Sequence, residues 1–434
     1  MVHDSTYLPC FLNVDRPQIQ SLQLTLPTDL PTQIIRQIND SLEIDPSDGR
    51  SCAATGRLWD YILESHRIPY LMLRVADMRM SMGSKVTALA LYDELKGILN
   101  NPEFSHWVVQ SKLSVQQETH SLLSEYKDSS YFTPSQRWVP TAQHPFPRCR
   151  LEKEDLQRFR ELWESLKFKN NNEALFLNMH CLETNYIEGT FAFDTYTNDR
   201  LVVIGFYDQE QRLKYDLTDP ERGAVRSLQD ALSILQDTHR ALTHIYIFRE
   251  PEPPALDVQM LCQLHAELMK TSRVLYDETH QKGRLSYTNI GITRQTSRVN
   301  VTASSMFRGE IVRVQFCPFD EVEAELDLFC RRFNEIIRDD DMDPFAAAAW
   351  ISYTFVYIHP FEDGNGRLSR MLASIPLIRQ GLPPICIRKS SQVGYIANLN
   401  KTREMARHGD YKGLMRTLFT INENSLALLL FPAF

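Results

Sequence analysis

Residues 343–358 read DPFAAAAWISYTFVYI, and this stretch restricts the fold more than any other part of the chain. The helix that it would form is apolar on nearly every side, so it has no face suited to water. Asp343 suits the N-cap, and Pro344 suits the first helical position, where a backbone N–H would be unpaired anyway. A helix of this kind belongs in the middle of a bundle, so we expect a helical core around it.

The next twelve residues, HPFEDGNGRLSR, gather charged groups and glycines where a second helix begins. Gly364, Asn365 and Gly366 can bring backbone N–H groups close to a ligand, and the positive end of the helix dipole favours an anion there. Arg367 and Arg370 are three residues apart, so they project from one side of that helix and can hold further phosphate oxygens. The segment therefore predicts a polyphosphate site.

Two more side chains of this segment suit a reaction at a phosphate. Asp363 offers a hard oxygen ligand for Mg²⁺ held jointly with the phosphates. His359, at the end of the core helix, can accept a proton from an attacking hydroxyl. The alternative is a loop of solvated turn residues with a buried structural histidine. A Walker-type P-loop is excluded because GxxxxGK[ST] does not occur.

This segment resembles the signature of the Fic-domain family, HxFx[DE]GNGRxxR, at every specified position. A looser resemblance extends over residues 225–420 and leaves residues 1–150 uncovered. The family's fold is a helical bundle with a β-hairpin flap. The matching residues are His359, Phe361, Asp363, Gly364, Asn365, Gly366, Arg367 and Arg370.

The resemblance implies transfer of AMP from Mg-ATP to a Ser, Thr or Tyr hydroxyl of a protein. By motif position, His359 is the general base and Asp363 the Mg²⁺ ligand. Residues 364–366 form the anion hole, Arg367 holds the outer phosphates, and Arg370 holds the γ-phosphate. Doc-like kinases of the family carry Lys where this chain has Gly366, which favours nucleotidyl transfer here. Phosphocholine transfer is a further family variant that the motif leaves open.

Upstream, LETNYIEGT resembles the family's inhibitory pattern [ST]xxxE[GN] through Thr184, Glu188 and Gly189. Glu188 ends an expected helix, and Gly189 is a natural helix terminator. We expect Glu188 to pair with Arg370 and so to misplace the triphosphate. Related proteins with this arrangement also remove AMP, so a de-adenylylating activity stays open. The alternative is an exposed glutamate at a helix end without an inhibitory role.

Two further elements have expected roles in ligand binding. TSRVNVTASSMFRGEIVRVQF alternates as a hairpin over 296–316, with SSMFR as its turn, and stands where the family has its flap. We expect it to dock the target protein as an added strand, unless it is a purely structural hairpin. Its candidate lining residues are Val299, Val301, Ile311 and Val314. Tyr395 and Asn398 stand where the family often contacts adenine, although helix packing would explain both.

We expect a mainly α protein: a Fic-like helical bundle core with a β-hairpin flap, plus an N-terminal helical accessory region. The expected parts are an accessory region and linker (1–150), an inhibitory-helix region with a hairpin around Asp208–Gln211 (151–220), and the Fic-like catalytic core (221–434). Helical periodicity between Thr55 and Lys127 predicts two to four packed helices in the first part.

Composition limits the binding partners and the cellular location that we expect for this protein. The 434 residues carry a net charge of −8 without long charged runs, so no nucleic-acid partner is expected. The apolar stretches are too short for a membrane span, and no leader pattern is legible. Eight separated cysteines favour reduced thiols and a cytoplasmic or nuclear location. A homodimer is compatible with the sequence, and a non-catalytic ATP-binding regulator is the alternative from another class. The sequence does not identify the target protein or the signal that relieves inhibition.

Overall fold

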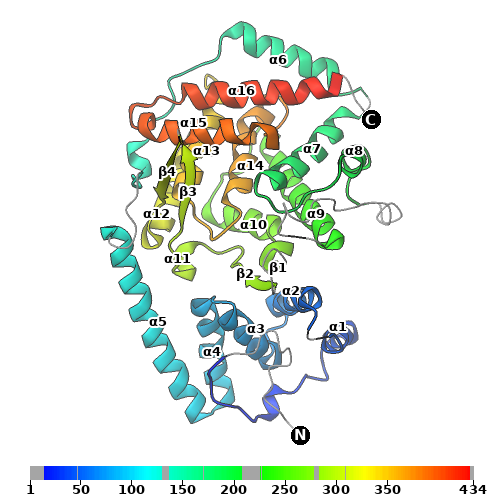
Figure 1. The fold of residues 1–434 in the computed structure, drawn as a ribbon, viewed down its shortest axis with the longest axis vertical. Helices are drawn as coiled ribbons and strands as arrows, with labels where there is room; N and C mark the ends of the chain where they lie inside the picture. The colour runs from blue at the N-terminus through cyan, green and yellow to red at the C-terminus, as the bar shows by residue number, and fades with distance from the viewer. Residues whose placement is uncertain are drawn as a thin grey trace. The chain divides into compact units, whose positions relative to one another are not determined.

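A computed structural model describes residues 14–45, 47–129, 136–169, 171–207, 225, 227–277, 283–307 and 309–430. Helices dominate the described chain, and its strands form two separate two-stranded sheets (Figure 1), so the mainly α fold is confirmed. The α-helices of the N-terminal part are α1 (Thr32–Leu42), α2 (Gly49–Ser65), α3 (Pro69–Ser81), α4 (Lys85–Leu99) and α5 (Pro102–Asp128).

The rest of the chain contains the remaining helices and both hairpins. The helices before the core helix are α6 (Lys153–Leu166), α7 (Asn172–Ile187), α8 (Thr195–Ile204), α9 (Leu228–His244), α10 (Val258–Leu268), α11 (Arg294–Ser297) and α12 (Val322–Ile336). The core helix and its successors are α13 (Pro344–Ile358), α14 (Asn365–Arg379), α15 (Gln392–Met405) and α16 (Lys412–Ala427). The strands are β1 (Val274–Asp277), β2 (Arg284–Tyr287), β3 (Thr302–Phe307) and β4 (Glu310–Gln315).

The chain divides into two compact units, and the division is discontinuous. Unit 1 combines Met1–Asp128 with Thr271–Asn289, and unit 2 combines Ser129–Lys270 with Ile290–Phe434. The β1–β2 hairpin therefore belongs to the N-terminal helical unit, although it lies far along the chain. The boundaries at 150 and 220 that the sequence suggests stay predictions.

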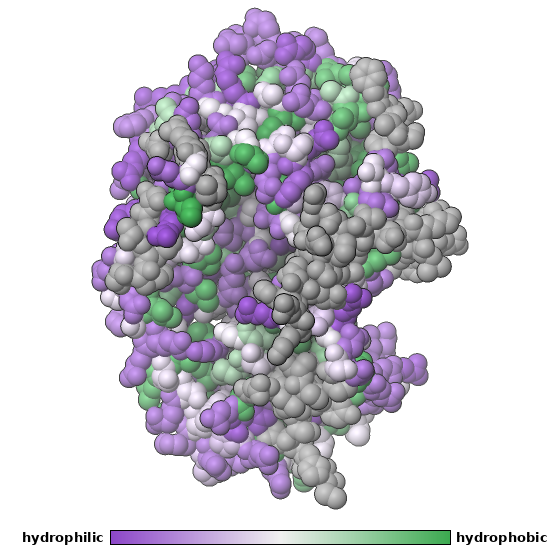
Figure 2. All heavy atoms as spheres, in the orientation of Figure 1, coloured by the Kyte–Doolittle hydropathy of each residue, from purple (hydrophilic) through white to green (hydrophobic). Residues whose placement is uncertain are grey.

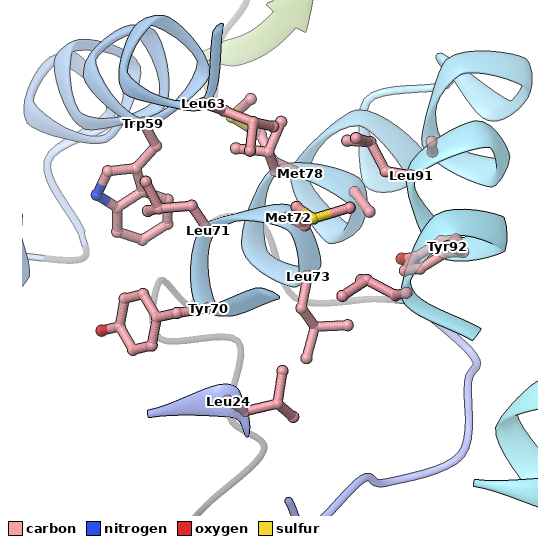
Figure 3. Close-up of a cluster of buried hydrophobic side chains, with 14 of the residues drawn as sticks. Leu24, Trp59, Leu63, Tyr70, Leu71, Met72, Leu73, Met78, Leu91 and Tyr92 are labelled. Carbon is pink, nitrogen blue, oxygen red and sulfur yellow. The ribbon is translucent and has the colours of Figure 1, made fainter. Parts of the chain in front are cut away.

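Unit 1 has its own apolar core, in which α2, α3 and α4 supply most side chains. Trp59, Leu71 and Tyr92 are buried there, and Figure 3 shows Leu71 beside Trp59. Val274 joins this core from β1. An ion network fastens the inserted segment as well: the Arg273 guanidinium donates to Asp60 at 2.8 Å and to Glu64 at 2.6 Å.

Helix α13 is the centre of unit 2. All but one of its residues are buried, and it packs against α12, α14 and α16. The predicted cap is confirmed: the Asp343 carboxylate accepts hydrogen bonds from the N–H groups of Phe345 and Ala346, both at 2.9 Å. The apolar composition of α13 is thus explained by its burial. On the face drawn in Figure 2, by contrast, hydrophilic side chains cover most of the described surface.

The second hairpin forms where the sequence predicts it, but its strands are longer. β3 pairs with β4 in antiparallel register, with Ala303 opposite Val314 and Phe307 opposite Glu310. Residues 304–307, which were expected in the turn, therefore belong to β3, and the connection lies at Gly309. Gln136 pairs with β4 on its other edge: it donates to Arg313 O at 3.1 Å and accepts from Gln315 N at 3.0 Å.

Two expectations fail in the structure. The segment 201–204, expected as the first arm of a hairpin, is the end of α8. Asp194 caps that helix by accepting from Thr197 N at 2.6 Å, and burial of Leu201 and Val202 outweighs their β-propensity. The rest of that expected hairpin, including Asp208–Gln211, lies outside the described residues. Cys52 is disulfide-bonded, against the expectation of reduced thiols.

Among the described residues, no helix has both the length and the apolar content that crossing a bilayer requires.

Candidate active site

His359 is positioned by the end of the core helix. It caps α13 in the left-handed conformation, with φ 53° and ψ 60°, which is uncommon for a residue with a Cβ. Its N–H donates to Phe355 O at 3.0 Å. Its ring nitrogen Nδ1 lies 3.2 Å from Val356 O, and because a carbonyl only accepts, Nδ1 carries the proton. Nε2 is therefore left with a lone pair, as a general base requires.

The surroundings of His359 keep the imidazole neutral. Its ring stacks on Phe316, with centroids 3.9 Å apart and planes 14° apart. Burial lowers the pKa of His359 to about 3, and the positive charges of Arg294 and Arg403 act in the same direction, whereas the Val356 bond and Asp363 oppose them. The ring is thus unprotonated at neutral pH and can accept a proton.

The turn after His359 is closed by the side chain of Asn365. Its Oδ1 accepts from Phe361 N at 3.0 Å, and its Nδ2 donates to Phe361 O at 2.8 Å. The Phe361 ring is buried and stacks on His265, with centroids 3.8 Å apart. Gly364 has φ +76°, and a Cβ there would overlap the Met269 side chain. Glycine is therefore required at this point of the turn.

Asp363 faces outward beside the start of α14. Its Oδ1 accepts from Gly364 N at 2.6 Å, and its Oδ2 lies 3.4 Å from the Arg367 guanidinium. The Asp363 side chain is 61% exposed. Mg²⁺ in nucleotide sites is commonly held by one or two carboxylates together with phosphate oxygens and water. The exposed Asp363 carboxylate fits this pattern, in which phosphates complete the coordination. Among the described residues, no three His, Cys, Asp or Glu side chains cluster as a metal site.

Arg370 is held by the end of α7. Its Nε donates to Thr184 Oγ1 at 2.7 Å, and its Nη2 donates to Thr184 O at 3.0 Å. The same Nη2 pairs with Glu188 Oε1 at 2.6 Å. Glu188 follows the last helical residue, and Gly189 ends the helix with φ +67°. The ion pair between Glu188 and Arg370, expected from the sequence, is present.

The Glu188 carboxylate also occupies the start of α14. A Cβ built on Gly366 would overlap Glu188 Oε1 and would lie 3.2 Å from Arg370 Nη1. A second residue of α7 reaches this helix too, since Asn185 Oδ1 accepts from Arg367 at 3.3 Å. Backbone N–H groups at a helix start attract anions, so this position suits the negative charge of Glu188.

Two expected nucleotide-binding residues make other contacts. The Tyr395 hydroxyl lies 2.8 Å from Ser352 Oγ, and its ring is buried. Asn398 donates to Gly394 O at 3.0 Å within its own helix. Their role in adenine binding stays a prediction.

The expected lining residues of the hairpin separate into two groups. Val299 and Ile311 are exposed, by 39% and 60%, whereas Val314 is buried and Val301 packs against the same small apolar cluster. Phe316, which stacks on His359, belongs to that cluster. The hairpin is therefore directly connected to the catalytic loop, while target docking on it stays a prediction.

Sequence reasoning assigned no role to two buried residues around this loop. His265 lies in α10, where its Nδ1 accepts from Gly291 N at 3.0 Å and its Nε2 donates to Asp363 O at 3.0 Å. Its only sequence signal is a polar side chain on an apolar helix face. Arg294 has no exposed surface and donates to four backbone carbonyls. Nothing local in the sequence indicates this.

The core helix α13, the tight turn that carries His359 and the start of α14 together form a helical domain of defined geometry. Residues 255–377 match the model of the Fic/DOC family. The chain thus carries a Fic/DOC-family domain, as its loop residues suggest.

The related proteins match only part of the chain. A protein adenylyltransferase Fic of Nematostella vectensis is 37% identical over 97 residues, which are 22% of this chain and 22% of that protein. A protein of the same name from Culex quinquefasciatus is 39% identical over 110 residues, which are 25% of this chain and 21% of that protein. The matched region is therefore about a fifth of the length of these relatives.

The chain also resembles solved structures of Fic proteins. A Fic domain-containing signalling protein from Bacteroides thetaiotaomicron superposes with a TM-score of 0.46 at 18% identity, over 64% of this chain and 97% of that one. A Fic-1 protein from C. elegans gives a TM-score of 0.39 at 15% identity, over 94% of this chain and 100% of that one.

Proposed function

We propose that this protein transfers AMP from Mg-ATP to a hydroxyl of a target protein and that Glu188 restrains this activity. The observation that carries the proposal is the arrangement of His359 and Asp363 on either side of the turn that leads into α14. This arrangement combines a neutral base, a carboxylate for the metal and a helix start for phosphate. The names of the related proteins support the same reaction class.

The reaction is an in-line displacement at the α-phosphorus. The acceptor oxygen attacks that atom while its proton passes to Nε2 of His359. The bond between the α-phosphorus and the oxygen leading to the β-phosphate breaks, and pyrophosphate leaves with its electrons. Asp363 is the residue that would hold Mg²⁺, which neutralises charge on the phosphate oxygens when bound. Catalysis of this kind depends on positioning and electrostatic stabilisation, and on one base.

In the resting state, we propose, Glu188 blocks the productive pose of ATP. Arg370 would hold the γ-phosphate, but it is already bonded to Glu188 and Thr184. A triphosphate that enters would meet the Glu188 carboxylate beside Gly366 and would be repelled from its aligned position. A displacement of about 1 Å at the reacting atom can cost about a hundredfold in rate.

The deciding experiment compares the parent protein with Glu188→Gly and Glu188→Gly/His359→Ala in Mg-ATP, with intact mass as the readout of self-modification. We expect a gain equal to AMP in the single variant alone. Glu173→Ala, in the first turn of the same helix, is the matched control and should behave as the parent. Equal modification of the parent and the Glu188→Gly variant would contradict the inhibitory role. A mass gain equal to phosphate would indicate a kinase-like reaction instead.

De-adenylylation by the same site is the second candidate, because Glu188 stands beside the phosphate position and can orient water. Its test is the release of AMP from a modified substrate by the parent protein and the loss of that release in Glu188→Gly. A non-catalytic ATP-binding regulator would bind ATP in all variants and modify nothing.

We further propose that the target docks along the 296–316 hairpin. Within the described sheets β3 pairs only with β4, whereas Gln136 covers part of the outer edge of β4. A strand of the target would therefore add to β3. Proline substitution of Thr302 tests this, because it should reduce target modification without affecting ATP binding. A homodimer stays compatible with this proposal and is tested by light scattering.

A further inference from the structure

Arg294 is a cation without any exposed surface, and its guanidinium donates to four backbone carbonyls. It donates through Nε to His359 O at 2.6 Å and through Nη2 to Ile358 O at 3.2 Å. These two carbonyls are at the C-terminal end of α13, where helical hydrogen bonding stops. The guanidinium therefore caps the core helix at the residue that we propose as the base.

The other bonds of Arg294 reach the hairpin. Its Nη1 donates to Val299 O at 2.9 Å, just before β3, and its Nη2 donates to Cys317 O at 2.7 Å, just after β4. The two ends of the hairpin are thus tied to each other and to the end of α13 by a single side chain. A guanidinium presents five N–H donors in a rigid fork, which an ammonium cannot reproduce.

We propose that Arg294 is a positioning residue that fixes His359 relative to the β3–β4 hairpin. This inference rests on the proposed transfer reaction and adds a device that no motif position specifies. His359 stands in the left-handed region, which is unfavourable for a residue with a Cβ, so its backbone needs external support. Arg294 supplies that support at the His359 carbonyl, while Phe316 stacks on the ring.

The four carbonyl groups that accept hydrogen bonds from Arg294 lie outside the phosphate-binding segment. None of its four carbonyl partners belongs to residues 363–370, where the metal and phosphates would bind. Loss of the guanidinium should therefore change the alignment of the base and the docked acceptor without changing the affinity for ATP. A purely structural role would lower both together with thermal stability.

The experiment uses the full chain in the Glu188→Gly background. Arg294→Met, Arg294→Lys and the control Arg338→Met are compared by the initial rate of self-modification, by calorimetric titration of Mg-ATP, and by thermal unfolding. Arg338 is an exposed arginine that lies outside the hairpin and outside residues 359–370. We expect Arg294→Met to lose about a hundredfold in rate with ATP affinity within twofold of its parent, Arg294→Lys to be intermediate, and Arg338→Met to be unchanged.

Hydrogen exchange separates failure of this inference from failure of the proposed function, because it needs no activity. Faster exchange over both 299–317 and 355–362 in Arg294→Met, but not in Arg338→Met, supports the link even where the parent transfers no AMP. If Arg294→Met does not fold, Arg294→Lys decides. A folded Arg294→Lys with parental rate and parental exchange overturns the inference, and so does a loss of rate that is matched by loss of ATP affinity.

Discussion

The Glu188 carboxylate lies directly against Gly366, so that a methyl group on Gly366 would overlap Oε1. The next nearest side-chain atoms to such a methyl group are Glu188 Cδ and Arg370 Nη1, both at 3.2 Å. The size of residue 366 and the position of the inhibitory side chain are therefore coupled. This coupling is specific to the resting state, because removal of Glu188 removes the overlapping atoms and leaves only the flexible end of Arg370 close to the methyl group.

Gly366→Ala should therefore destabilise the parent by about 1 kcal/mol, since the carboxylate must leave its ion pair with Arg370, which is partly exposed on the Glu188 side. The same substitution in Glu188→Gly should have almost no effect. Thermal unfolding of the four proteins forms a double-mutant cycle that isolates the coupling. Equal destabilisation in both backgrounds would show that the carboxylate does not lie on this glycine.

Asp363→Asn should abolish the Mg²⁺ dependence of ATP binding and leave the melting temperature unchanged. The side chain is 61% exposed, so it contributes little to packing, and an amide is a far weaker ligand for Mg²⁺ than a carboxylate. Titration of ATP with and without Mg²⁺ measures the effect. Glu362→Gln, one residue earlier, is the control and should keep the Mg²⁺ dependence. Retention of that dependence in Asp363→Asn would rule out Asp363 as the ligand.

Asn365→Asp should lower both stability and ATP affinity. The present amide donates to Phe361 O and accepts from Phe361 N, and a carboxylate would lose the first bond and repel the carbonyl. A broken buried hydrogen bond of this kind costs about 1–3 kcal/mol. Denaturant titration and calorimetry give the two readouts.

Asn334 offers a matched control for this prediction. Its amide makes the same pair of bonds to the backbone of Leu256, at 2.8 and 2.9 Å, away from the catalytic loop. Asn334→Asp should lower stability in the same way and leave ATP affinity unchanged. Equal effects of the two variants on ATP binding would mean that Asn365 has no specific role in shaping the turn.

The catalytic turn could be predicted from the sequence because its signals are local. Asp343, Pro344 and the glycines mark the ends of two helices, and their spacing determines what meets between them. The inhibitory position of Glu188 could also be predicted, because its short pattern ends at a glycine that stops a helix. The ion pair with Arg370 is long-range, however, and only the family resemblance indicated it.

The features that the sequence did not indicate, or indicated wrongly, depend instead on contacts between distant residues. The β1–β2 hairpin packs in the N-terminal unit through Val274 and Arg273, and no local pattern specifies a contact more than 200 residues away. Leu201 and Val202 read as strand residues, but tertiary burial and the Asp194 cap favour a helix. Nothing in the sequence around Arg294 indicates that its guanidinium donates to four backbone carbonyls.

The buried histidines predict how stability depends on pH. Burial lowers the pKa of His144, His180 and His265 to about 4 and that of His359 to about 3, from an ordinary value of 6.5. Between about pH 4 and 6.5 the unfolded chain therefore binds protons that the folded chain does not. The free energy of unfolding should fall as pH drops below 6.5, by up to about 1.4 kcal/mol per pH unit for each such histidine.

Urea unfolding at pH 7.5, 6.0 and 5.0 checks this dependence, and one variant pair isolates the contribution of a single ring. His180→Met removes a histidine that has 1% exposed surface and lies near Arg370, so the loss of stability between pH 6.0 and 5.0 should become smaller by about 1 kcal/mol. His408→Gln removes an exposed histidine and should leave the slope as it is in the parent. Because the carboxylates contribute equally to all three proteins, an identical slope in His180→Met and the parent would show that His180 titrates alike in the folded and unfolded chains.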